Sequence, residues 1–129
     1  MKHTISVITP VYNDPIGISV TLDSLLALRT TDRYEVVVVD NGSTDTTLDR
    51  IQNHSSENPN IRWFREIEVQ GSYAARNTGI EHAEGDVLSF LDADETVEED
   101  WLETALAAMD DQDVDYLGCA VDLTLEEDT

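Results

Sequence analysis

Three polar segments of the sequence hold the residues best suited to chemistry, and each follows an apolar run. They are residues 9–14 (TPVYND), 40–45 (DNGSTD) and 92–95 (DADE). If the apolar runs are strands of one parallel sheet, the carboxyl ends of these strands meet at a single edge. Open α/β sheets bind their ligands at that edge. The sequence therefore predicts one cleft to which all three segments contribute.

Asp92 and Asp94 form an Asp-x-Asp pair directly after the apolar run 87–91. Two carboxylates this close repel each other unless a cation joins them. Oxygen ligands suit Mg²⁺ or Mn²⁺, and such ions commonly bridge a carboxylate to a diphosphate. We therefore interpret Asp94 and Asp92 as candidate metal ligands. The alternative is a solvated acidic loop, which is common in so acidic a chain.

Three further side chains are of types that bind nucleotides. Asp40 ends the run 34–39, where its carboxylate could accept a hydrogen bond from a nucleobase N–H. The ring of Tyr12 could stack on a base, and the guanidinium of Arg76 could offset the charge of a diphosphate. Each has a structural alternative. Asp40 would then be a turn or helix-capping residue, Tyr12 a rim residue, and Arg76 the partner of a neighbouring acid.

Alternating strand-like and helix-like segments must position these side chains. Short apolar runs predict strands, and apolar residues at helical spacing predict helices. The expected strands are 4–10, 34–39, 61–64, 87–91 and 116–121. The expected helices are 16–28, 43–53 with Ser43 as the cap, 71–83, and one that begins after 98–100. This alternation indicates an α/β fold with a mostly parallel sheet flanked by helices.

The charge of the chain is unusual. Its 129 residues, enough for one domain, include 28 acidic and 7 basic ones, which gives a net charge of -21. We interpret this excess as an adaptation to high salt, as in a halophilic archaeon; the alternative is an ordinary acidic protein. A nucleic-acid partner is disfavoured because phosphate contacts need Lys and Arg.

The sequence also bears on location. No apolar run approaches the roughly 20 residues that span a bilayer, and the amino terminus does not have the pattern of a signal peptide. The single cysteine, Cys119, excludes an internal disulfide and reads as a small core residue. A chain without disulfides suits a reducing compartment. We expect a cytoplasmic location and leave association with the inner membrane surface open.

Taken together, the motifs resemble those of the family 2 glycosyltransferases with the GT-A fold. The matching segments are 7–13 (VITPVYN), 38–45 (VVDNGSTD), 71–80 (GSYAARNTGI), 83–86 (AEGD) and 90–94 (FLDAD). Each motif alone is modest, but the ordered set at this spacing is highly specific. The resemblance implies a truncated GT-A domain. Residues 1–123 would form its nucleotide-sugar-binding part, and 124–129 an acidic carboxyl-terminal tail.

The resemblance also implies a site, residue by residue. The residues that would bind the nucleotide are Pro10, Val11, Tyr12, Asp14, Asp40, Arg76, Asp92 and Ala93. Asp40 would face the base, and Asp94 with Asp92 would hold Mn²⁺ or Mg²⁺. Asn77 and Gly79 would shape a loop–helix junction. Position 41 is Asn, where many relatives carry a second Asp, and this removes one polar contact with the base.

The implied reaction is an inverting, metal-dependent transfer of a sugar. The donor would be a nucleoside-diphosphate sugar, and the acceptor a hydroxyl of an unidentified glycan, lipid or protein. The carboxylate base would lie in a downstream acceptor-binding half, so we assign no catalytic residue here. The alternative is a truncated or split nucleotide-sugar-binding module without its own transferase activity. A haloacid-dehalogenase-type phosphatase is disfavoured because it needs a downstream lysine, and Lys2 is the only lysine.

Low salt should destabilise this chain. At a net charge of -21 the carboxylates repel one another, and molar salt removes most of that repulsion by shortening the Debye length to about 3 Å. We expect the chain to lose compactness in dilute buffer and its melting temperature to rise with KCl up to molar concentration. Circular dichroism during heating measures this. A melt that does not respond to KCl would contradict the interpretation.

Overall fold

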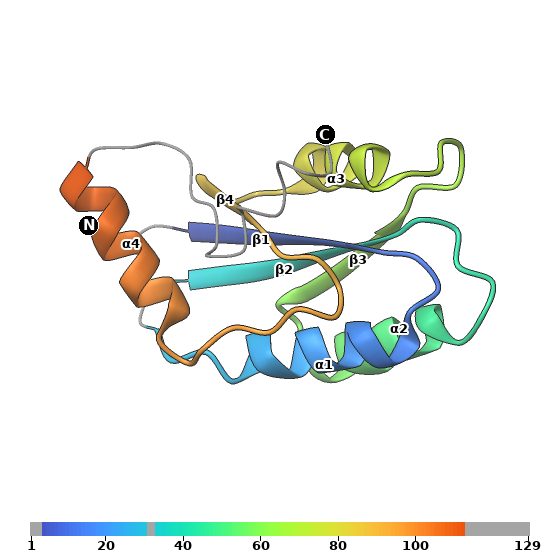
Figure 1. The fold of residues 1–129 in the computed structure, drawn as a ribbon, viewed down its shortest axis with the longest axis horizontal. Coiled ribbons are helices and arrows are strands. Elements are labelled where there is room, and N and C mark those ends of the chain that lie inside the picture. The colour runs from blue at the N-terminus through green and yellow to red at the C-terminus, as the bar shows by residue number, and fades with distance from the viewer. Residues whose placement is uncertain (1–3, 31–32, 113–129) are drawn as a thin grey trace.

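The computed structural model describes residues 4–30 and 33–112 (Figure 1). The strands are β1 (Thr4–Val11), β2 (Arg33–Asp40), β3 (Ile61–Arg65) and β4 (Val87–Phe90). They pair in parallel in the order β3-β2-β1-β4. This confirms the predicted α/β fold with a parallel sheet. The expected strand 116–121, Cys119 and the acidic tail lie outside the described residues.

Helices cover both faces of the sheet. They are α1 (Pro15–Leu26), α2 (Thr47–Glu57), α3 (Ser72–His82) and α4 (Trp101–Gln112). In Figure 1, α1 and α2 lie below the sheet and α3 lies above it. Among the described residues, none of the helices is both long and apolar enough to span a membrane.

The core has two parts because β2 is buried on both faces. Val36 and Val38 belong to a large cluster with apolar residues of α1 and α2, together with Leu102 and Leu106 of α4. Val37 belongs to a smaller cluster beneath α3. A continuous apolar run is typical of a strand in such a covered sheet. The predicted helix after 98–100 is confirmed as α4, and its Leu102 and Leu106 are buried in the core.

The predicted start of the second helix was wrong. This helix begins at Thr47, not near Ser43, and continues to Glu57 rather than ending at 53. The Ser43 hydroxyl instead accepts the Asn13 N–H at 2.8 Å, which ties the loop after β2 to the loop after β1. The Asp45 carboxylate accepts the Thr47 N–H at 2.9 Å and so satisfies the first turn of α2.

Gly79 does not shape a loop–helix junction, and neither does Asn77, because both lie inside α3. A Cβ on Gly79 would lie 2.5 Å from Cγ2 of Ile8 in β1. Real Cβ contacts are longer than this, so the glycine lets α3 pack directly on the central strand. This predicted role was therefore wrong, and the observed one is packing.

A hydrogen-bond network around Glu35 fastens the amino-terminal edge of the sheet. Its carboxylate accepts bonds from Ser6 Oγ at 2.6 Å, the Glu84 N–H at 2.8 Å and Arg62 Nε at 2.9 Å. Ser6 Oγ in turn accepts the Gly85 N–H at 2.8 Å. Partial burial alone would raise the pKa of Glu35, but these hydrogen bonds outweigh it and lower the pKa.

Replacement of Glu35 by Gln should make stability less dependent on pH. Because folding lowers the pKa of Glu35, its contribution is present above the unfolded value of 4.5 and is lost as pH falls through the folded pKa. We expect the free energy of unfolding of wild type to exceed that of Glu35→Gln by about 1 kcal/mol near pH 7, and this difference to vanish near pH 3. Urea unfolding across this range measures it.

The matched control is Glu57→Gln, which makes the same charge change at an exposed position at the end of α2. Wild type and this variant should differ by a nearly constant amount across the same pH range. If the difference in unfolding free energy from wild type depended on pH equally in both variants, the Glu35 network would make no specific contribution to stability.

Candidate functional site

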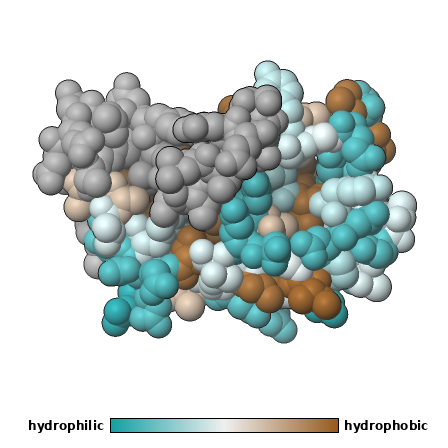
Figure 2. Space-filling model, viewed as in Figure 1, coloured by the Kyte–Doolittle hydropathy of each residue, from teal (hydrophilic) through white to brown (hydrophobic). Residues whose placement is uncertain are grey.

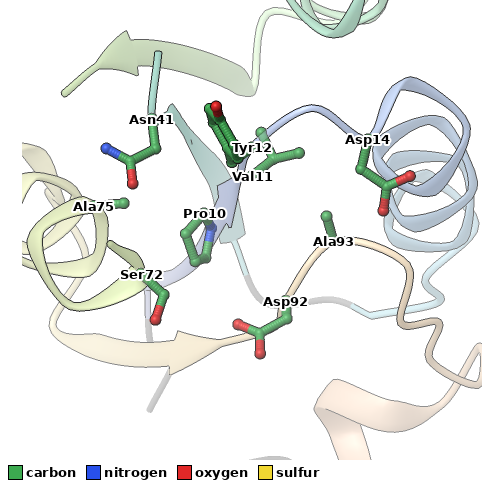
Figure 3. A pocket seen from close by; sticks show the side chains of 9 residues that line it. All are labelled: Pro10, Val11, Tyr12, Asp14, Asn41, Ser72, Ala75, Asp92 and Ala93. Atoms are coloured by element: carbon green, nitrogen blue, oxygen red, sulfur yellow. The ribbon is translucent and has the colours of Figure 1, made fainter. Parts of the chain in front are cut away.

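A cavity of about 210 Å³ lies at the carboxyl edge of the sheet (Figure 3). Its lining residues are Pro10, Val11, Tyr12, Asp14, Asn41, Ser72, Ala75, Asp92 and Ala93. They come from the end of β1, the end of β2, the start of α3 and the segment after β4. The three predicted polar segments therefore do meet at one edge, and α3 supplies a further wall.

Six of the predicted nucleotide-binding residues line this cavity: Pro10, Val11, Tyr12, Asp14, Asp92 and Ala93. Tyr12 is 48% exposed, so its ring stands at the rim. The Asp14 carboxylate accepts the Gly17 N–H at 3.0 Å and caps α1. In Figure 3 Asp14 and Ala93 lie on one side of the cavity, and Asn41, Ser72 and Ala75 on the other.

Asp40 is placed differently from the expectation. It follows Val36 and Val38 at a spacing of two residues, so its side chain points to the face covered by α1 and α2. It is fully buried, and its Oδ2 accepts bonds from the Ser43 N–H and Arg65 Nε, both at 3.1 Å. The structure therefore brings Asn41, not Asp40, to the cavity.

Arg76 pairs with one of the two predicted metal ligands. Its Nη2 lies 3.1 Å from Asp92 Oδ1, and the two side chains are 18% and 32% exposed. The pair connects α3 to the segment after β4, as the ion-pair alternative for Arg76 predicts. Since Asp92 lines the cavity, the guanidinium also offsets negative charge at the cavity wall.

Asp94 lies on a tightly hydrogen-bonded turn beside the cavity. Its φ of 83° is uncommon for a residue other than glycine. The turn is held by the Asp94 N–H, which donates to Gly17 O at 3.2 Å, and by the Glu95 N–H, which donates to Asp92 O at 3.2 Å. The Asp94 side chain is exposed and does not line the cavity.

The donor atoms suit a divalent cation that a ligand would help to coordinate. Among residues 4–30 and 33–112, no group of three or more His, Cys, Asp or Glu side chains could hold a metal ion. Mg²⁺ is commonly bound through one or two carboxylates, with water and phosphate oxygens completing the shell. Asp94 and Asp92 are of the right chemical type for such a site, although Asp92 already pairs with Arg76.

Asn41, Ser72, Ala75 and Arg65 were not singled out as binding residues by the sequence. Asn41 and the two α3 residues line the cavity, whereas Arg65 holds Asp40 from the end of β3. Ser72 and Ala75 lie within the segment 71–80 that carried part of the resemblance. The spacing of Ser72 and Ala75 in a helix was a usable signal, because residues three apart share one face.

Comparison with known proteins decides the family. Residues 6–129 match the model described as Glycosyl transferase family 2. The chain belongs to this family. It is 41% identical over 121 residues to Glycosyltransferase AglE of Haloferax volcanii, covering 93% of this chain and 40% of that protein. The chain thus spans less than half the length of this family 2 relative.

Solved structures agree with the family 2 assignment. Mannosyltransferase PcManGT from Pyrobaculum calidifontis, in complex with GDP-Man and Mn²⁺, superposes with a TM-score of 0.78 at 31% identity, over 84% of this chain and 33% of that one. TarS of S. aureus in complex with UDP superposes with a TM-score of 0.74 at 33% identity, over 86% of this chain and 32% of that one. Neither is described as a separate binding module, so the comparisons do not favour that alternative.

Loss of Arg65 should destabilise this family 2 domain. Arg65→Met would leave the buried carboxylate of Asp40 without its cation, at a cost of about 2 kcal/mol. Urea unfolding measures the change. The matched control is Arg29→Met, because the Arg29–Glu99 pair is 77% and 60% exposed and should contribute less than about 1 kcal/mol. Equal effects in the two variants would contradict this account of Asp40.

Proposed function

We propose that this chain is the nucleotide-sugar-binding part of a glycosyltransferase that transfers a sugar from a nucleoside-diphosphate sugar to an acceptor hydroxyl. The observation that carries the proposal is the cavity where Tyr12, Asn41 and Asp92 meet at the carboxyl edge of a parallel sheet. Open α/β sheets bind nucleotides at this edge. The similar structures named with UDP, UDP-GlcNAc and GDP-Man support this ligand class.

In this proposal the lining residues bind the nucleoside and its phosphates. Tyr12 offers its exposed ring to the base. Asp92 lies near the ribose and diphosphate, and Arg76 beside it offsets phosphate charge. Asp40 supports the loop after β2 from the opposite face, through the Ser43 N–H. The resemblance gave Asp40 the contact with the base, but Asp40 does not line the cavity and Asn41 does.

Asp94, with Asp92, would hold Mn²⁺ or Mg²⁺. When bound, the cation stabilises negative charge on the leaving diphosphate. The chain's own residues bind and orient the donor. We assign the general base, the inverting attack and acceptor recognition to the part of the relatives' length that this chain does not span. Residues 1–123 would form the donor-binding part and 124–129 an acidic tail.

We propose a high-salt, cytoplasmic setting for this activity, and the composition of the surface supports the high-salt part of this proposal. Figure 2 shows hydrophilic residues over much of the visible described surface, in keeping with the net charge of -21. The 41% identity to a protein of Haloferax volcanii adds support. Such charge density is tolerated where salt screens repulsion between carboxylates.

Asp94→Asn tests the proposed donor and metal site. Calorimetric titration in molar KCl would measure the affinity for UDP and for GDP with and without Mn²⁺. We expect wild type to bind at least one of them more tightly with Mn²⁺, and Asp94→Asn to lose about tenfold in that gain because a neutral amide is a weaker ligand.

The matched control is Asp49→Asn, which makes the same charge change at an exposed position on α2. It should keep the wild-type response to Mn²⁺. Equal metal-dependent affinity in wild type and Asp94→Asn would remove Asp94 from the role. No binding of either nucleotide by the wild-type chain would overturn the proposed function.

A further inference from the structure

Every polar group of Asn41 is engaged within the protein. Its Nδ2 donates to Glu66 O at 2.8 Å and to Val69 O at 3.0 Å. Its Oδ1 accepts the Gly71 N–H at 2.6 Å, and its backbone carbonyl accepts Gln70 Nε2 at 3.0 Å. A side-chain amide has two N–H groups to donate, so Asn41 has no donor left to offer a ligand.

The side chain of Glu66 forms further hydrogen bonds, both within this segment and to α3. Its Oε1 accepts the Thr78 hydroxyl at 2.7 Å, and its Oε2 accepts the N–H groups of Glu68 and Val69, both at 3.0 Å. The hydrogen bond from Thr78, the largest cause, lowers the pKa of Glu66 and keeps it an acceptor. We call Asn41, Glu66 and the segment 66–71 the Asn41–Glu66 brace.

The brace ends where the cavity wall begins. Gly71, whose N–H donates to Asn41 Oδ1, is the residue before α3, and Ser72 and Ala75 of α3 line the cavity. Gly71 adopts a φ of 138°, a conformation that few other residues reach. A shift of the segment 66–71 would therefore move the start of α3 and change the shape of the cavity.

We infer that Asn41 is a positioning residue, which holds the segment 66–71 so that α3 forms the cavity wall, and that its amide donates no hydrogen bond to the base. The inference rests on the proposed function, because the cavity is taken as the nucleotide site. The sequence predicted only that Asn41, in place of the Asp of many relatives, removes a polar contact with the base. The structure instead gives Asn41 a structural role of its own. An Asp here would accept but could not donate, so the carbonyls of Glu66 and Val69 would face a carboxylate.

Two variants with opposite charge changes test the inference. Asn41→Asp adds a negative charge at the cavity, and Glu66→Ala removes one at a residue that does not line it. If the brace shapes the site, both variants should raise the Kd for UDP with Mn²⁺ by about tenfold. Electrostatic attraction alone would move the two affinities in opposite directions. Asn53→Asp, an exposed change of the same type on α2, should leave the Kd unchanged.

Titrations should be run at a temperature where circular dichroism shows every variant to be folded, so that global stability does not enter. Tighter or unchanged UDP binding in Asn41→Asp, or unchanged binding in Glu66→Ala, would overturn the inference. Amide hydrogen exchange of Gly71 gives a separate readout, expected to be faster in both variants. If wild type binds neither UDP nor GDP, the proposed function fails. If amide exchange at Gly71 were also unchanged in both variants, the positioning role of the Asn41–Glu66 brace would be overturned as well.

Discussion

The parallel pairing of β1 with both β2 and β4 is the constraint on which the site depends. Val11 lies opposite Asp40, and Ile8 lies opposite Phe90. The Leu91 N–H continues the ladder by donating to Ile8 O at 3.1 Å. β1 and β2 therefore end level with each other and β4 ends opposite Ile8, and the chain leaves each strand toward the same edge. A change of register in β4 would carry Asp92 away from the cavity.

The opposite edge of the sheet fixes that register. The Asp86 N–H donates to Thr4 O at 2.8 Å, and the Thr4 N–H donates back to Asp86 Oδ1 at 2.9 Å. Gly85 is required beside them because a Cβ there would lie 2.5 Å from Thr4 O. The segment 83–86 contributed to the resemblance without an assigned role. Its role is to anchor the start of β4, so a motif at one edge determines where Asp92 lies at the other.

The sequence predicted the strands and the fold well because apolar runs report burial directly. The same property prevented a prediction of which way the end of β2 faces. Val36 to Val39 are all fully buried, so the run does not alternate between polar and apolar residues. Without alternation, Asp40 and Asn41 are equally plausible on either face. The two faces are distinguished by the hydrogen bonds from Arg65 to Asp40 and from Asn41 to the Glu66 carbonyl. Each of these bonds joins residues about 25 positions apart, so the local pattern does not reveal it. The start of α2 was unreadable for a related reason, since five consecutive residues, 43–47, are all of types that cap helices.

Arginines near the strand ends offset part of the negative charge around this site. If the cavity binds a diphosphate as proposed, a chain with a net charge of -21 would repel this anion unless positive charge lies close to the cavity. Arg65 and Arg76 are two of its seven basic residues. Arg65 pairs with Asp40, the last residue of β2, and Arg76 pairs with Asp92, which follows β4. These pairs remove net charge from the strand ends while leaving the acidic surface elsewhere. High salt screens the distant carboxylates but acts less on partly buried pairs. The Arg76–Asp92 pair therefore keeps the cavity wall closer to neutral, and the Arg65–Asp40 pair neutralises the buried end of β2 on the opposite face, in the salt concentrations that screen the rest of the surface.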